Sequence, residues 1–267
     1  MRITETLSYS TVQIRSKLKD GSTGFGTGFF IALKKDGKDV LLIVTNKHVI
    51  KDAFTSKFIV TVDTGENPSK TKHEIDLLGG KWIPHPEKNV DLCCLDVTEM
   101  RPLVEKKDGV KWRISPFTRE QILSKDDCAK YAPTDEVFMV GYPDAIRDRV
   151  YNQPIFRRGV FATNPGLDFE GRPEVLVDMA VFNGSSGSPV LVLNSGLHVE
   201  DETVVYTPPQ EADASLFGVA FAACVHNAEG ELVPVPIALM LQTQTEIPNN
   251  LGVVVKAYKI LDFEALI

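Results

Sequence analysis

Asn183-Gly184-Ser185-Ser186-Gly187-Ser188-Pro189 lies between two apolar stretches of strand-like composition, residues 175–177 and 190–193. A serine that attacks an acyl group needs a tight, glycine-rich turn, because backbone N–H groups must converge on the oxygen that becomes negative. Gly184 tolerates the unusual φ that turns its N–H toward that oxygen, and Gly187 leaves room for a substrate backbone. Taken alone, the segment fits a nucleophile loop and a plain hairpin turn about equally well, because serine and glycine are common in turns.

Two earlier segments supply the other residue types that such a serine needs. Residues 43–50, Ile-Val-Thr-Asn-Lys-His-Val-Ile, are a strand rich in β-branched residues that runs into a short turn holding His48. Asp91 heads the apolar stretch 90–95, where its charge needs a partner. Alone, the histidine fits a packed structural residue and the aspartate fits a cap or a turn acid. Together with the serine they follow the chain order of the chymotrypsin triad.

These motifs resemble those of the chymotrypsin-like (trypsin-fold) serine endopeptidases, especially the disulfide-free bacterial trypsin-like peptidases related to the Deg/HtrA proteases. Residues 26–30 look like their GxGF strand, 45–49 like TxxHV, 91–95 like DLALL and 184–189 like G(D/N)SGGP. Residues 140–143 and 251–255 are weaker matches. The resemblance extends from about residue 11 to residue 261.

The resemblance implies a role for each site residue. Ser186 would attack the scissile carbonyl, His48 would take the serine proton, and Asp91 would orient the imidazole. The N–H groups of Gly184 and Ser186 would form the oxyanion hole. Ser185 is the competing nucleophile, and the Gly-x-Ser-Gly register favours Ser186. Because Ser185 replaces the acidic residue that pairs with a new N-terminus in zymogen-activated members, we expect no such activation.

The resemblance also predicts the pocket for the residue before the scissile bond, P1. Ala180 lies six residues before Ser186, where trypsin-like members carry the acid that binds Arg or Lys. Alanine offers no counter-charge, so a basic P1 residue would be desolvated without a partner. We therefore predict a medium-sized apolar P1 residue, such as Leu, Val, Met or Phe. The predicted S1 walls are Ala180, Val181, Phe182, Phe221, Ala222, Ala223 and Gly252.

The sequence predicts an all-β fold, because many short apolar runs recur at roughly even spacing. These runs are residues 29–33, 40–44, 58–62, 92–95, 137–140, 175–177, 190–193, 217–221 and 253–255. With the resemblance, they predict two six-stranded antiparallel Greek-key β-barrels and a short C-terminal helix over residues 256–267. The predicted units are an N-terminal barrel (1–115) with His48 and Asp91, a connector (116–134) with a helix near 118–124, and a C-terminal barrel (135–267) with Ser186 and an acidic insertion (194–215).

Composition excludes several classes of protein. The 267 residues include 29 Lys and Arg against 36 Asp and Glu, a net charge of −7 that argues against a nucleic-acid or anionic-membrane partner. The apolar runs are too short to span a membrane, and no secretory signal begins the chain, so we expect a cytoplasmic location. No metal or cofactor is expected, because the cysteines and the remaining histidines (His73, His85, His198 and His226) lack ligand spacing. We expect these histidines at surface or capping positions. The sequence does not decide whether Cys128 and Cys224 form a disulfide.

The sequence leaves three function classes to compare. The first is an active serine endopeptidase that acts on a protein or peptide. The second is a catalytically silent or latent trypsin-fold domain that binds peptides or a regulatory partner, beside an adjacent domain or alone. The third is another acyl hydrolase with the same triad. A dinucleotide site at residues 24–28 is disfavoured, because a strand rather than a helix follows the glycines.

Overall fold

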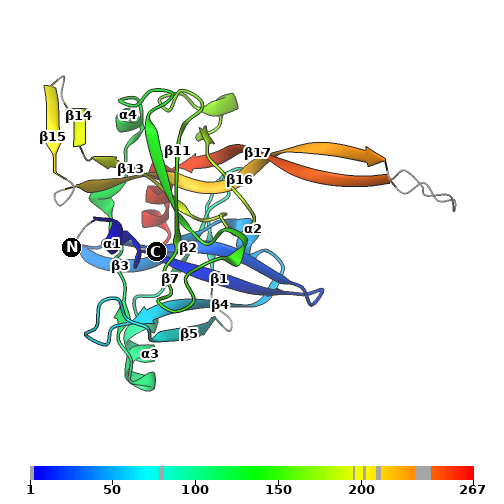
Figure 1. Cartoon of the computed structure of the whole chain (residues 1–267). Helices are drawn as coiled ribbons and strands as arrows, with labels where there is room; N and C mark the ends of the chain where they lie inside the picture. Colours follow the sequence, from blue (N-terminus) through cyan, green and yellow to red (C-terminus); the bar gives the residue numbers. More distant parts are fainter. Residues whose placement is uncertain (1–2, 78–80, 195, 201–202, 209–211, 232–241) are drawn as a thin grey trace, which may run out of the picture.

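The computed structural model consists of two β units joined by an irregular segment, with few helices (Figure 1). It describes residues 3–77, 81–194, 196–200, 203–208, 212–231 and 242–267. The N-terminal strands, blue to cyan in Figure 1, form most of the lower unit, and later strands form the upper unit. No helix in these ranges is long and apolar enough to cross a membrane.

The first unit is a nine-stranded sheet whose main path runs β5-β4-β1-β2-β3-β7-β6. Two short strands lie off this path: β8, at the end of the predicted N-terminal barrel, pairs with β4, and β9, in the expected connector, pairs with β2 in parallel. Its helices α1 and α2 are short, and α3 follows β7. The bounds are α1 Ile3–Leu7, β1 Thr11–Leu18, β2 Thr23–Lys35, β3 Lys38–Thr45, α2 Lys47–Ile50, β4 Ala53–Val62, β5 Lys72–Leu77, β6 Ile83–Pro84, β7 Cys93–Asp96, α3 Met100–Asp108, β8 Trp112–Arg113 and β9 Phe117–Thr118.

The second unit is a closed six-stranded antiparallel barrel of order β10-β11-β12-β17-β16-β13. The acidic insertion contributes a separate two-stranded sheet, β14–β15, and the chain ends in the 3₁₀ helix η4. The bounds are η1 Arg119–Gln121, α4 Lys125–Cys128, β10 Glu136–Gly141, η2 Pro143–Ala145, β11 Ile155–Phe161, η3 Phe169–Gly171, β12 Glu174–Asp178, β13 Pro189–Asn194, β14 Gly196–Glu200, β15 Thr203–Thr207, β16 Asp213–Glu231, β17 Gln242–Lys256 and η4 Ala257–Ala265.

The predicted all-β class is confirmed, with differences in detail. The first unit has nine strands instead of six: seven lie on its main path, and β8 and β9 pair with β4 and β2 off that path. The helix expected near residues 118–124 is a single 3₁₀ turn, and the α-helical turn starts after Ser124, whose side chain accepts a hydrogen bond from the N–H of Asp127. The C-terminal helix is of the 3₁₀ type.

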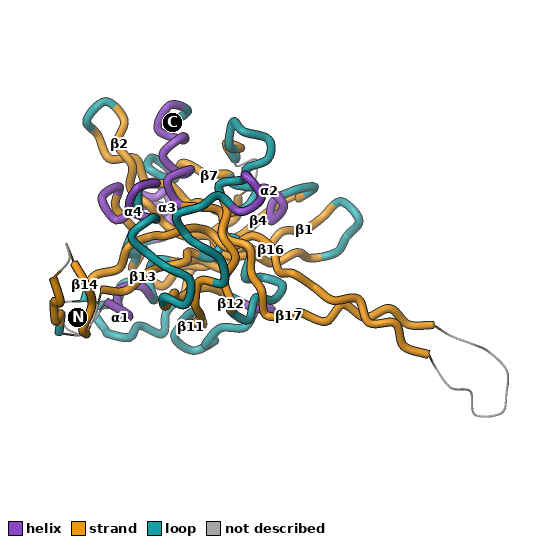
Figure 2. The backbone as a smooth tube through the Cα atoms, turned by 90° about the horizontal axis from the view of Figure 1, so that it is seen from above, coloured by secondary structure: helices purple, strands orange, loops and turns teal. Residues whose placement is uncertain are grey.

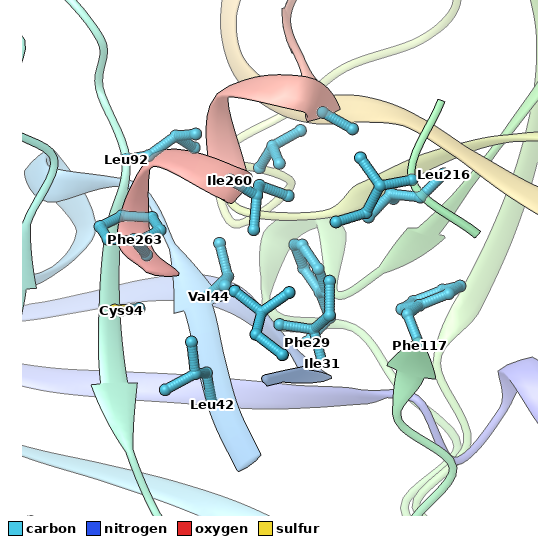
Figure 3. Packing of buried hydrophobic residues seen from close by; sticks show 14 of the residues in the cluster. Phe29, Ile31, Leu42, Val44, Leu92, Cys94, Phe117, Leu216, Ile260 and Phe263 are labelled. Atoms are coloured by element: carbon cyan, nitrogen blue, oxygen red, sulfur yellow. The ribbon is translucent and has the colours of Figure 1, made fainter. Parts of the chain in front are cut away.

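A shared apolar core joins the two units (Figure 3). The continuous apolar run of β3 is explained by burial on both faces: Leu42 and Val44 pack in this shared core, while Ile43 packs in the core of the first sheet. Burial of this interface favours one fixed arrangement of the units. Other members of the shared core are Phe29, Ile31, Leu216, Ile260 and Phe263.

Strands β16 and β17 continue beyond the barrel as a two-stranded arm (Figures 1 and 2). Their pairing runs on from Val225 opposite Pro248 to Glu231 opposite Gln242. At the base of the arm, β16 shifts register between Ala220 and Ala222, which leaves Phe221 outside the regular ladder. The arm therefore starts in the stretch that was predicted to form one S1 wall.

Candidate active site

His48 and Asp91 come together because the strands that precede and follow them are paired. His48 lies in α2 directly after β3, and Asp91 lies two residues before β7, which pairs with β3. His48 Nδ1 is 2.5 Å from Asp91 Oδ2, and the His48 N–H donates to Asp91 Oδ1 at 3.3 Å. The buried side chain of Asn46 donates to the Asp91 carbonyl at 2.8 Å, a contact that the sequence did not suggest. The carboxylate thus fixes both the ring and the backbone of the histidine.

The Ser186 loop is held between the two units. The N–H of Thr27 on β2 donates to the Ser186 carbonyl at 2.8 Å, and the Thr27 hydroxyl donates to the Gly184 carbonyl at 2.9 Å. From the other side, the Gly187 N–H donates to the Ala220 carbonyl at 2.8 Å. Thr45, three residues before His48, donates its hydroxyl to the Thr27 carbonyl at 2.7 Å. Thr27 therefore couples the serine loop to the strand that leads to His48.

Two backbone donors of this loop are free to bind an oxygen. The Asp144 N–H donates to the Asn183 carbonyl at 2.5 Å, and Gly184 has a φ of +84°. Because the C=O and N–H of a trans peptide point in opposite directions, the Gly184 N–H points away from Asp144. Within the described ranges, the N–H groups of Gly184 and Ser186 have no hydrogen-bond acceptor. Unpaired N–H groups are rare in folded proteins, and a pair in one loop suits a developing oxyanion.

The Ser186 hydroxyl does not point at His48 in this structure. Its Oγ donates to the Phe221 carbonyl at 3.4 Å, and no hydrogen bond among the described residues joins Ser186 to His48. The Phe221 carbonyl is accessible because Phe221 lies at the register shift of β16. Rotation about the single Cα–Cβ bond of Ser186 would redirect the hydroxyl without moving the loop.

The neighbouring serines are packed inside the loop. Ser185 is fully buried, and its Oγ accepts a hydrogen bond from the Phe182 N–H at 3.3 Å. Ser188 is fully buried too, and it packs so closely on Gly141 that a Cβ there would meet its Oγ at 2.0 Å. Ser186 alone of the three is partly exposed, so it is the serine that a substrate can reach.

The predicted S1 residues lie on β16 and β17 of the closed barrel and in the segment after β12. Val181 follows β12, Gly252 lies on β17 and Ala223 lies on β16, in the spatial order β12-β17-β16. Gly252 is opposite Ala223, and a Cβ on Gly252 would meet a methyl group of Val181 at 2.6 Å. Ala180, Phe182, Phe221 and Ala222 are half-buried along the same edge. The guanidinium of Arg157, which the sequence did not single out, lies 4.9 Å from the centre of the Phe182 ring.

The thiols near the site are protonated and enclosed. Burial is the main cause that raises the pKa of Cys93 well above its usual value, and burial raises the pKa of Cys94 to about 12. Cys128 is a free buried thiol with a pKa raised to about 11, so it forms no disulfide here. The side chain of Cys224 lies outside the described part. Because the thiolate is the reactive form, these cysteines are poor nucleophiles.

Among the described residues, no group of three or more His, Cys, Asp or Glu side chains could hold a metal ion. Of the two positions expected for His85, surface or capping, the surface position is wrong, because the residue is 3% exposed. It does cap the backbone: its Nδ1 accepts the Glu87 N–H at 3.1 Å, and its Nε2 is 3.0 Å from Asp262 of η4. His73 contacts Asp108 at 3.0 Å. The side chains of His198 and His226 lie outside the described part.

Replacing Thr27 by valine is expected to loosen the serine loop. The change keeps the shape but leaves the Gly184 carbonyl and the Tyr142 N–H without their partner hydroxyl. Each of these two buried groups costs about 1–3 kcal/mol, so the free energy of unfolding should fall by about 2–6 kcal/mol. Urea unfolding measures this loss. Thr27→Ser, which keeps the hydroxyl, should stay within about 1 kcal/mol of wild type, and equal losses in both variants would contradict the assignment.

Together, a histidine–aspartate pair on one β unit and a serine loop with free N–H groups on the other define the chymotrypsin-like class of peptidase folds. The model of the trypsin-like peptidase domain matches residues 26–199. The chain belongs to this family, which confirms the predicted trypsin-like fold class.

Solved structures share this architecture at low sequence identity. The HtrA-type protease AlgW, solved with a tripeptide, is 10% identical at a TM-score of 0.53, and the match covers 98% of this chain. The present chain spans 62% of that AlgW chain. HL collagenase is 13% identical at a TM-score of 0.51, with 97% of this chain and 93% of the collagenase covered. None of the curated proteins compared with the chain matches it.

Proposed function

We propose that this domain cleaves peptide bonds with Ser186 as nucleophile, His48 as base and acid, and Asp91 as the group that orients His48. The observation that carries the proposal is the 2.5 Å contact between His48 Nδ1 and Asp91 Oδ2. This contact leaves Nε2 as the ring atom that exchanges a proton with the serine. The two free N–H groups of Gly184 and Ser186 support the same assignment.

The proposed reaction forms an acyl-enzyme on Ser186 and then hydrolyses it. The Ser186 Oγ bonds to the scissile carbonyl carbon while its proton passes to His48 Nε2, and the carbonyl π electrons move onto the oxygen that Gly184 and Ser186 bind. His48 then gives the proton to the leaving nitrogen as the C–N bond breaks, which leaves an acyl-enzyme. Water attacks that ester, its proton goes to His48 and then to the Ser186 oxygen, and the acid is released.

A substrate would first have to release the Ser186 hydroxyl from Phe221. Once the hydroxyl turns to His48, the Phe221 carbonyl becomes free to accept a hydrogen bond from the substrate backbone. The contact between Ser186 and Phe221 equally suits the alternative, a latent or silent domain that binds peptides. The two functions differ in whether Ser186 reacts.

An activity-based probe separates them. The protein is treated with a fluorophosphonate, and the adduct is located by mass spectrometry. The proposal expects labelling at Ser186 that disappears in His48→Ala and persists in Ser185→Ala, the matched control for a neighbouring serine. No labelling in the presence of peptide substrates would favour the silent domain. Labelling with turnover of esters alone would favour another acyl hydrolase.

The proposed P1 preference is apolar. Ala180 brings no negative charge to the pocket, and the nearby Arg157 guanidinium over Phe182 would repel a basic P1 side chain. Cleavage of a peptide library should therefore be enriched in Leu, Val, Met or Phe at P1, with kcat/KM at least about tenfold above that for Arg or Lys. Mass spectrometry of the products reads the preference directly. Dominant cleavage after Arg or Lys would exclude it.

A further inference from the structure

A groove with a volume of about 310 Å³ lies on the outer face of the first sheet. Its wall includes a row of directly paired residues: Phe25 on β2 is opposite Arg15 on β1, and Arg15 is opposite Lys57 on β4. Lys17, the next residue on this face of β1, lines it as well. Phe25 is 40% exposed, which makes it an accessible apolar edge of the groove.

This groove begins beside the serine loop, on the side away from S1. Phe25 is two residues from Thr27, whose N–H donates to the Ser186 carbonyl. The predicted S1 walls belong to the closed barrel, whereas the groove belongs to the first sheet. A peptide that fills S1, crosses Ser186 and continues over β2 and β1 would bring its leaving group to this groove.

The loop after β10 brings more positive charge to the same place. The buried Gln13 side chain donates to the Ala145 carbonyl at 3.0 Å, and its Oε1 accepts from both Arg15 and Arg147 at 3.2 Å. Two guanidinium groups thus share one neutral oxygen. Burial, followed by the charge of Arg15, lowers the pKa of Arg147, as expected for cations that lack a counter-ion.

The carboxylates near these cations are already engaged. Glu74, which also lines the groove, accepts from Lys57 at 3.0 Å, and Asp76 is 3.0 Å from the same ammonium group. Asp148 in the loop accepts the N–H of Val150 at 2.7 Å and that of Tyr151 at 3.0 Å. Within the described ranges, Arg15, Lys17 and Arg147 form no ion pair with a carboxylate. These three cations therefore give the groove and the adjoining loop a local positive charge in a protein of net charge −7.

We propose that this groove binds an acidic side chain of the substrate, at the second or third residue after the scissile bond. The proposal rests on the proposed peptidase function and adds a substrate class to it. Arg15 and Arg147 would bind the carboxylate through charge-assisted hydrogen bonds, and Phe25 would pack on the stem of the acidic side chain.

The spacing agrees with this position. Two residues of β2 and one step between neighbouring strands separate Thr27 from Arg15, a distance on the order of 8–10 Å. An extended peptide advances about 3.3 Å per residue. The second or third residue of the leaving group would then reach Arg15, while the first would still lie beside Ser186.

Paired peptides test the proposal. Two C-terminally amidated peptides, identical except for Glu or Gln at the second and third leaving-group residues, are compared by kcat/KM. Wild type should prefer the Glu peptide by roughly three- to tenfold at low salt, as expected of charge-assisted bonds at a partly exposed site. Arg15→Gln should remove the preference and leave cleavage of the Gln peptide within about twofold. Lys34→Gln, an exposed residue at the far end of β2, is the matched loss of charge and should keep the preference.

Binding of the same peptides to Ser186→Ala separates this proposal from the proposed function. Equal cleavage of both peptides by wild type would overturn the groove and leave the peptidase assignment intact. No cleavage, with tighter binding of the Glu peptide that Arg15→Gln removes, would retain the groove and overturn the peptidase assignment. A preference confined to peptides with a free C-terminus would overturn the side-chain assignment in favour of the terminal carboxylate.

Discussion

Ser186→Ala is expected to lower kcat for peptide hydrolysis roughly 10⁴–10⁶-fold, the loss typical of a triad nucleophile. Ser186 is the partly exposed serine of the loop, and its own N–H is one of the two free N–H groups that would receive the oxyanion. His48→Ala should cost about as much, because a serine without its base is a weak nucleophile. The measurement is kcat on a peptide that wild type cleaves.

Two further variants test whether Ser186 and His48 act together as nucleophile and base. Since nucleophile and base act as a unit, the Ser186→Ala, His48→Ala double variant should be little worse than either single one. Ser185→Ala removes a buried serine of the same loop and should retain most of the activity. If Ser185→Ala abolished turnover while Ser186→Ala kept it, the nucleophile would be misassigned.

Gly187→Ala is expected to disrupt the serine loop more than any change of a side-chain functional group. A Cβ at this position would lie 1.9 Å from the Thr27 carbonyl oxygen and 2.5 Å from the Thr45 hydroxyl. Thr27 is hydrogen-bonded to the serine loop, and the Thr45 hydroxyl is hydrogen-bonded to the Thr27 carbonyl. Neither group can move without breaking these hydrogen bonds. The residue also has a φ of +87°. We expect the free energy of unfolding to fall by more than about 4 kcal/mol, with loss of activity, in urea unfolding and kinetic assays.

The chain offers a matched control for this change. Gly21 has a φ of +86°, and a Cβ there would meet nothing within 4 Å. Gly21→Ala therefore carries the backbone strain without the collision and should cost about 1–2 kcal/mol. The difference between the two variants isolates the close approach to Thr27. Equal losses would show that the left-handed backbone alone explains the effect.

The fold class and the site motifs could be predicted because each depends on a short local pattern. The run around Leu42-Ile43-Val44 indicated a strand, and pairing of that strand with β7 explains why a histidine after one and an aspartate before the other meet. The glycines around Ser186 indicated a tight turn, and the positive φ values of Gly184 and Gly187 agree with it.

Other features depend on contacts between distant segments, which the local pattern does not contain. The cations beside the groove come from segments far apart in the sequence. Gln13 and Arg15 lie on β1, whereas Arg147 lies in a loop 134 residues after Gln13. Neither segment alone therefore predicted the groove. His85 was expected at a surface or capping position, and its contact with Asp262 requires η4 to fold back on the first sheet. The direction of the Ser186 hydroxyl follows from a register shift in β16 that the sequence does not mark.

The hydrogen bonds between Thr27 and the serine loop also determine at which stage of synthesis the candidate site can form. His48 and Asp91 emerge from the ribosome long before Ser186, and domains fold largely in the order of synthesis. The serine loop needs Thr27 from the first unit on one side and Ala220 from β16 on the other. A nascent chain that stops anywhere before β16 would hold the base without a shaped nucleophile. The proposed proteolytic capacity would therefore arise only after β16 has been synthesised, and chains truncated before it would be harmless to their neighbours.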